Sequence, residues 1–163
     1  MIQIVVTGIE EATGRLRAAI EWGVGMGLEI VGERGIGLVI EGTPVGATGN
    51  LAHSDFAYQQ GAGDLLTEVI TNGPPADVYS APVDLGSRPH FPPVDAIVPW
   101  VIKKFGVTDE QTARGIAFAI ARKIARRGTV GAFQYEKAME ILQGEAVGIL
   151  ERSIAESCAA AGF

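Results

Sequence analysis

Residues 9–40 read IEEATGRLRAAIEWGVGMGLEIVGERGIGLVI, and their apolar side chains recur at the spacing of an α-helix. A glycine in a helix costs about 1 kcal/mol relative to alanine, so a helix here needs compensation from close packing. Gly23 and Gly27 lie one turn apart and are suited to such a contact, with a sheet or with a neighbouring subunit. The alternative is a helix that breaks near residues 32–37. The glycines of this stretch are Gly14, Gly23, Gly25, Gly27, Gly32, Gly35 and Gly37.

Short β-branched or alternating stretches flank this helix and predict a small sheet. Residues 2–7 (IQIVVT) read as a strand before it. After the glycine-rich loop at 42–50, turn signals separate three further strand-like stretches. Short strands spaced in this way favour an antiparallel meander. The three stretches are residues 51–59, 65–71 and 77–83.

The last third of the chain predicts helices. Beyond the proline-rich segment 86–93, residues 94–105 form an amphipathic pattern that we expect to bury Ile97, Trp100, Val101 and Phe105. Residues 108–111 (TDEQ) have the form of a capping box. The helix that follows runs to Arg127, ends at Gly128 and presents an inner face made of Ala113, Ile116, Ile120 and Ile124.

A final helix is expected over residues 135–157. The predicted elements segregate along the chain instead of alternating, which indicates the α+β class. We therefore expect a single domain over residues 1–163, in which a long N-terminal helix packs on a small antiparallel sheet and C-terminal helices follow.

Composition narrows the class of protein. The chain has 163 residues, of which 47% are hydrophobic and 20% charged, a balance typical of a folded domain. With one cysteine, Cys158, and no stretch that reads as a signal peptide or membrane span, we expect folding in a reducing cytoplasm. The net charge is −6, and it is unevenly spread. Residues 1–95 carry 12 acids and 4 bases (−8), whereas residues 96–163 carry 7 acids and 9 bases (+2).

The sequence lacks the usual signatures of catalytic and cofactor chemistry. Residues 23–28 (GVGMGL) miss the third glycine of a dinucleotide fingerprint, and no lysine follows the glycines of 42–49. Ser87 is not in a nucleophile elbow. We therefore assign no catalytic, cofactor-binding or metal-binding residue and expect a protein that is not an enzyme. A small hydrolase with an unrecognised site stays an alternative, with a triad drawn from His53, Asp55, Asp84 and His90.

Four segments, in order along the chain, resemble the tail-component family of tailed bacteriophages. Residues 42–51 (GTPVGATGNL) are similar to the family's turn after its long N-terminal helix, and residues 79–91 (YSAPVDLGSRPHF) to its segment ending in Thr-Arg-Pro-His. Residues 92–100 and 117–129 (AFAIARKIARRGT) resemble its C-terminal helices and Arg-Gly-Thr turn. The first helix is richer in glycine than the family pattern, and Asp84 and Ser87 replace its Glu and Thr.

The resemblance implies a structural subunit of the head–tail junction of a phage or prophage. Such subunits form rings, often sixfold, that contact other neck, connector and tail proteins, and a passing contact with DNA in the lumen stays open. A tail-terminator ring of the same virion is the alternative. We thus expect a homo-oligomer found in the virion, with no membrane partner and no cofactor. The expected interface residues are Thr43, Pro44, Thr48, Gly49, Asn50, Arg88, Pro89, His90, Arg122 and Arg126.

The basic stretch in residues 100–127 has two interpretations. Arg122 and Arg126 lie opposite the apolar face of their helix, so we expect them to be exposed and to contact an acidic surface of a neighbouring subunit. The other interpretation is a nucleic-acid-binding module, although the net charge opposes binding of free DNA. Its residues would be Arg114, Arg122, Lys123, Arg126 and Arg127.

Overall fold

The computed structural model describes residues 8–163, so the strand expected at residues 2–7 lies outside the described residues. Contacts between Cα atoms divide the chain into two compact units. The first unit comprises the chain up to Ile36 together with Ala57–Ile70 and Met139–Phe163, and the second comprises Gly37–Phe56 and Thr71–Ala138.

The first helix, α1, is continuous from Ile9 to Gly42, so the break considered near residues 32–37 does not occur. Within the first unit five of its six buried positions recur every four residues, which places them along one slowly turning stripe, and the sixth is Gly32. Three of the five positions are glycine, and the residues are Ala19, Gly23, Gly27, Val31 and Gly35. The glycine-rich pattern therefore belongs to an unbroken helix whose smallest residues face its neighbours.

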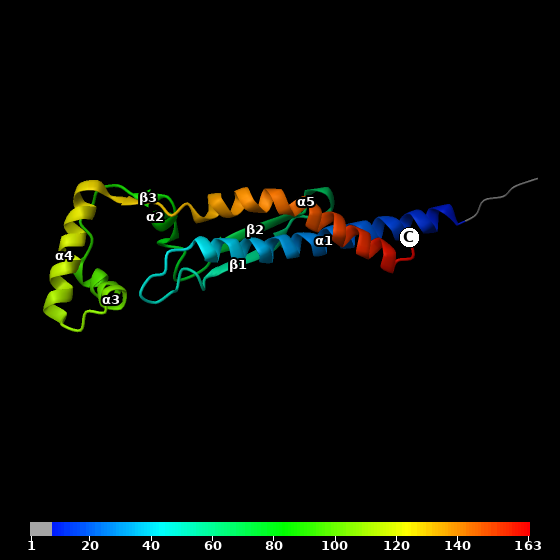
Figure 1. The fold of residues 1–163 in the computed structure, drawn as a ribbon. Helices are drawn as coiled ribbons and strands as arrows, with labels where there is room; N and C mark the ends of the chain where they lie inside the picture. Colours follow the sequence, from blue (N-terminus) through cyan, green and yellow to red (C-terminus); the bar gives the residue numbers. More distant parts are fainter. Residues whose placement is uncertain (1–7) are drawn as a thin grey trace, which may run out of the picture. The chain divides into compact units, whose positions relative to one another are not determined.

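The neighbour of this stripe is the last helix, α5 (Gln134–Ala160), which runs beside α1 in the first unit (Figure 1). A Cβ atom on Gly23 would lie 2.7 Å from the Cα atom of Ile154, and one on Gly27 would lie 2.9 Å from Cδ2 of Leu150. Ser157 donates a hydrogen bond of 2.7 Å to the carbonyl oxygen of Ala19. The expected close contact at Gly23 and Gly27 is thus confirmed, but its partner is α5 of the same chain and neither the sheet nor a neighbouring subunit.

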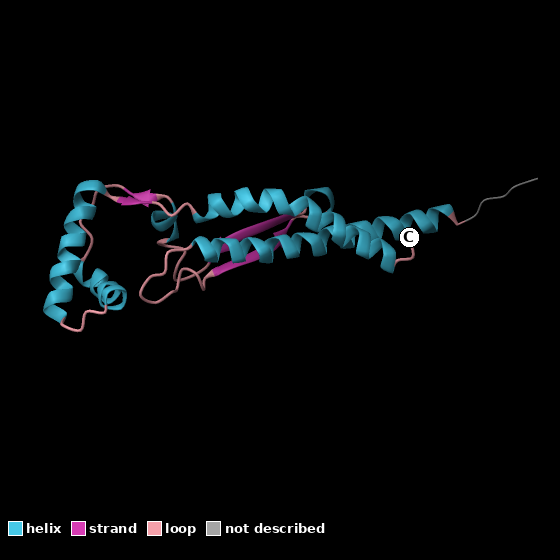
Figure 2. Cartoon of the chain, viewed as in Figure 1, coloured by secondary structure: helices cyan, strands magenta, loops and turns pink. Residues whose placement is uncertain are grey.

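Farther along α1, the partner is a two-stranded antiparallel sheet of β1 (Asp55–Gln60) and β2 (Thr67–Asn72), joined through the short helix η1 (Gly63–Leu65) (Figure 2). Gly32 lies under the side chain of Glu68, and Gly35 lies under that of Ile70. The predicted α+β class, with a long helix on a small antiparallel sheet and C-terminal helices, is confirmed.

The prediction of a third strand, at residues 77–83, is wrong. Turns occupy residues 74–79, and a short helix, α2, follows from Ser80 to Asp84. Pro82 explains the difference, because it cannot donate a hydrogen bond to a strand ladder but is tolerated in the first turn of a helix. The amide of Ser80 donates instead to the carbonyl of Ala76, at 2.8 Å.

In the second unit, α3 (Val94–Phe105) packs on α4 (Glu110–Arg127), and α3 has the predicted bounds. Val101 is fully buried against Ala113 and Ala117. Trp100 is only partly buried, and its ring meets that of Phe105 edge to face at 5.7 Å between centroids. Phe105 itself is exposed, so the expected core is confirmed at Val101 and wrong at Phe105.

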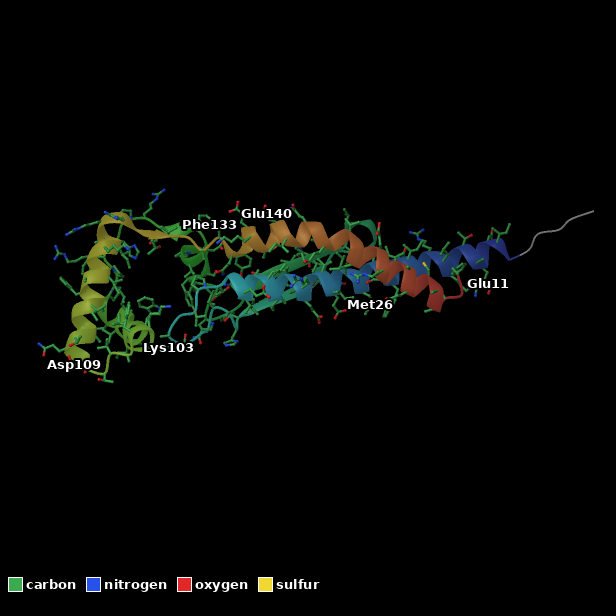
Figure 3. All side chains as sticks on the ribbon, viewed as in Figure 1. Glu11, Met26, Lys103, Asp109, Phe133 and Glu140 are labelled. Atoms are coloured by element: carbon green, nitrogen blue, oxygen red, sulfur yellow. The ribbon has the colours of Figure 1, made fainter. Side chains whose placement is uncertain are left out.

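The two ends of α4 are set by neighbouring residues. Its N-cap is Asp109, whose side chain accepts a hydrogen bond of 2.7 Å from the amide of Thr112 (Figure 3). The helix is thus capped one residue later than expected, at Asp109 and not at the Thr108 of the expected capping box. The helix ends at Gly128, as predicted. Its fully buried face is Ala113, Ala117 and Ala121, while the expected Ile116, Ile120 and Ile124 are half-buried.

The buried core contains few large side chains. All six phenylalanines are exposed, with 39% to 57% of their surface accessible. Among the described residues, the largest side chains that are fully buried are those of Gln134, Val39 and Val101. Much of the apolar content of the chain therefore lies at the surface.

We predict that Gly23→Ala lowers the free energy of unfolding by about 1–3 kcal/mol, because the added methyl group meets the backbone of α5 and forces the two helices apart. The matched control is Gly25→Ala, where nothing lies within 4 Å of the added atom. The free energy of unfolding of that variant should rise by about 0.5–1 kcal/mol, because alanine has a higher helix propensity than glycine. Urea denaturation followed by circular dichroism measures both. Equal stability of the two variants would contradict the close approach of the helices.

Candidate assembly surfaces

The two loops of the expected interface both contribute to one groove in the second unit. Pro44 comes from the first loop, and Ser87 and His90 come from the second. The structure thus brings together parts of two segments that lie more than forty residues apart. The groove is lined by Pro44, Tyr79, Pro82, Val83, Ser87, His90, Thr129, Val130, Gly131 and Ala132.

A short antiparallel ladder forms one wall of the groove, between β3 (Gly86–Ser87) and β4 (Thr129–Val130). The Ser87 amide donates to Oγ1 of Thr129 at 2.9 Å, and the two hydroxyl groups lie 2.8 Å apart. Gly128 has φ +69°, and a Cβ atom there would lie 1.9 Å from the carbonyl oxygen of Ser87. Only glycine fits so close a crossing of two backbones. Residues of the segments 79–91 and 117–129 are therefore paired directly.

Three of the four side chains considered for a catalytic triad are engaged in other interactions. Nδ1 of His90 lies 2.9 Å from the carbonyl oxygen of Arg88, which can only accept, so this nitrogen carries the proton. The Ser87 hydroxyl lies 3.4 Å from the same nitrogen, which therefore cannot serve as its base. Asp84 accepts hydrogen bonds from the amides of Gln134 and Tyr135, and thereby caps the start of α5. Asp55 accepts from the hydroxyl of Tyr135.

The first loop is only partly at the surface. Thr43 is buried, and its hydroxyl donates to the carbonyl of Val39 at 2.7 Å; Leu51 is buried as well. Thr43 is thus not exposed, unlike most of the interface residues expected in this loop. Pro44, Thr48 and Asn50 are exposed, and Gly49 is half-buried with φ +75°.

A hydrogen bond that joins α3 to the first loop was not predicted from the sequence. Lys103 of α3 donates a hydrogen bond of 3.0 Å to the carbonyl oxygen of Ala47. The lysine lies in the last turn of a predicted helix, which is a common place for a solvated base, so its sequence position gives no sign of a loop contact. In the second loop, Arg88, Pro89 and His90 are all exposed, as expected.

The predicted exposure of Arg122 and Arg126 is confirmed. Together with their neighbours on α4 they line a shallow hollow on the surface of the second unit. We call this surface the basic face, and its residues are Ala119, Arg122, Lys123, Arg126 and Arg127. Within residues 8–163, none of its four bases forms an ion pair. Arg114, in contrast, is paired with Asp95 and does not belong to this surface.

A cluster of buried and half-buried polar side chains surrounds the start of α5. Burial raises the pKa of Asp55, although the hydrogen bond from Tyr135, at 2.7 Å, acts in the opposite direction. Burial and the neighbouring carboxylates raise the pKa of Tyr135, so its hydroxyl stays a donor. Gln134 is fully buried, and neither polar atom of its side chain has a partner among the described residues. The start of α5 was predicted from sequence, but its anchoring by Asp84 and Asp55 was not.

No three His, Cys, Asp or Glu side chains among the described residues lie close enough to hold a metal ion. No helix between residues 8 and 163 is both long and apolar enough to cross a membrane. The chain matches no family model, no curated protein and no solved structure.

We predict that Asp55→Asn becomes progressively more stable than the wild type as the pH rises from about 3 to 7. An aspartate in an unfolded chain has a pKa of about 3.9. Because burial raises the pKa of Asp55 in the folded chain, its contribution to stability is largest below that value. The contribution is lost as the pH rises through the raised pKa. Asparagine does not titrate, and its oxygen still accepts from Tyr135.

Thermal unfolding at several pH values measures this difference. Asp77→Asn, at an exposed position of the same unit, controls for the loss of one negative charge. A difference between Asp55→Asn and the wild type that stays constant or shrinks with rising pH would show that Asp55 is not held in a desolvated site.

Proposed function

We propose that this chain is a structural subunit that assembles with its own copies into a ring. The observation that carries this proposal is the surface position of all six phenylalanines, together with Trp22, which is 69% exposed. Large apolar side chains at the surface of a folded chain can be covered by contacts with other proteins. A subunit of an assembly can leave such surface uncovered in the monomer because its neighbours bury it.

The charge distribution supports contacts between unlike surfaces. Residues 1–95 carry a net charge of −8 and residues 96–163 one of +2, so one copy can offer an acidic surface to a basic surface of the next. An interface between two different patches repeats from copy to copy and closes into a ring when the rotation allows it. Attraction between opposite charges would also select the correct neighbour.

We infer further that the ring belongs to the head–tail junction of a tailed phage or prophage, as a neck or tail-terminator ring. The support is the resemblance of residues 42–51, 79–91 and 117–129 to phage tail components. The groove gives these segments a shared structural role, since Pro44, Ser87 and Thr129 all line it. In this role the chain is made in the host cytoplasm and functions in the virion, in contact with connector and tail proteins.

The test is the mass of the purified full-length chain by native mass spectrometry, with negative-stain electron microscopy of the same sample. The proposal predicts closed rings of one defined order. It also predicts that the rings bind connector or tail-tube proteins of the phage or prophage that encodes the chain. A chain that stays monomeric at every concentration, with or without those proteins, would contradict it.

We predict that Arg122→Glu/Arg126→Glu weakens assembly while the helical content stays unchanged, because both side chains are exposed and only partner contacts are lost. Added salt should weaken wild-type assembly in the same direction, since exposed charges are screened within about 8–10 Å. Sedimentation velocity at low and high salt measures both effects. Lys104→Glu/Arg152→Glu makes the same change of net charge at exposed positions elsewhere and should assemble normally. Equal assembly of the two double variants would remove the arginines from the interface.

A further inference from the structure

One exposed face of α1 combines large apolar side chains with acids. At about 100° per residue, its five members fall within an arc of about 100° on the outer side of the helix. Trp22, Met26 and Ile30 are 69%, 41% and 43% exposed, and Met26 can be followed in Figure 3. Neither acid forms an ion pair with a base in the described part of the chain. We call this surface the acidic face, and its residues are Trp22, Met26, Glu29, Ile30 and Glu33.

The basic face of α4 has the complementary character. Phe118, which is 48% exposed, lies beside it on the same helix, and Ala119 leaves a hollow between the basic side chains. The aliphatic stems of arginine and lysine cover apolar side chains well while their charged ends stay in water. A hollow floored by alanine and walled by such stems therefore suits an apolar side chain that is accompanied by acids.

The spacing of the charges matches as well. Glu29 and Glu33 are four residues apart on α1, and Arg122 and Arg126 are four residues apart on α4. Each pair therefore spans about 6 Å along its helix, so two carboxylates can meet two guanidinium groups when the helices lie side by side.

We propose that the acidic face of α1 packs on the basic face of α4 of a second copy of this chain. This inference rests on the proposed ring assembly and names the surfaces that build it. Every copy carries both faces, so each contact leaves one acidic and one basic face free for further copies. The contact covers Trp22, Met26 and Ile30 and neutralises bases that have no partner within the described chain.

Nucleic acid is the other polyanion that a row of bases attracts, and the observations favour it less. The net charge of −6 repels DNA at long range. DNA would also leave the apolar side chains of α1 uncovered. The acidic face, in contrast, supplies opposite charge and apolar surface together. Every copy of the chain carries one acidic face for each basic face.

The experiment compares four variants of the full-length chain with the wild type by sedimentation velocity, with circular dichroism as the check on folding. Glu29→Lys/Glu33→Lys and Arg122→Glu/Arg126→Glu should each raise the concentration needed for assembly at least tenfold. The quadruple variant, which carries both changes in one chain, places lysines opposite glutamates at every contact and should assemble again. Glu136→Lys/Glu140→Lys reverses a second exposed acid pair of the same spacing on α5 and should assemble like the wild type.

The outcomes separate this inference from the proposed function. Wild-type rings with no sensitivity to either reversal, or a quadruple variant that stays dissociated, would overturn the pairing and leave ring assembly intact. A wild-type chain that never assembles would overturn both. Binding of a fluorescent DNA duplex that is lost in Arg122→Glu/Arg126→Glu while assembly is unchanged would assign the basic face to nucleic acid and overturn the contact.

Discussion

The close approach of α1 to α5 is the constraint on which the first unit depends. At Gly23 and Gly27 the two helices are so near that a methyl group would meet backbone or side-chain atoms of the partner. Contacts of this kind gain dispersion energy from many backbone atoms, but they exclude large side chains from the interface. Trp22, Met26 and Ile30 therefore lie outside it, on the exposed side of α1. Arg34 strengthens the contact with a salt bridge of 2.7 Å to Glu145 and lowers the pKa of that carboxylate.

The second unit follows the same principle with alanine in place of glycine. Ala113, Ala117 and Ala121 form the fully buried stripe of α4, and Phe118 and the four bases occupy its outer side. Cores of small residues bring helices together but bury little apolar surface per residue. In both units the larger apolar groups remain available to other molecules. The proposed contact between copies uses this surface, so the small-residue cores and the assembly have one physical origin.

The sequence was informative wherever one pattern dominated. The helical spacing located α1, α3 and α4, and the loss of helix propensity at Gly23 and Gly27 required the close contact that the structure contains. The same periodicity placed Arg122 and Arg126 on the outer face of α4. The strand expected at residues 77–83 failed because alternation carried more weight than Pro82. The exposure of Phe105 was missed because helical spacing alone does not show how far a neighbouring helix extends.

Features that depend on distant segments were not visible in the sequence. The cap that Asp84 provides for α5, and the ladder of Ser87 with Thr129, join residues that lie 42 to 51 positions apart. Thr43 was expected at an interface as part of the glycine- and proline-rich loop, yet its hydroxyl donates to the carbonyl oxygen of Val39 and closes the last turn of α1. Local turn chemistry identified these loops as rigid, and only the fold shows which of their side chains remain free for partners.

The central claim is that the apolar side chains on the outer face of α1 become covered when copies of the chain assemble. The most direct measurement is the fluorescence emission of Trp22 in a Trp100→Phe background, recorded over a range of protein concentrations alongside sedimentation. Trp22 and Trp100 are the two tryptophans of the chain, so the signal then comes from α1 alone. We predict a blue shift that develops together with assembly, because Trp22 leaves water. Emission typical of solvent-exposed tryptophan in fully assembled samples would contradict the account.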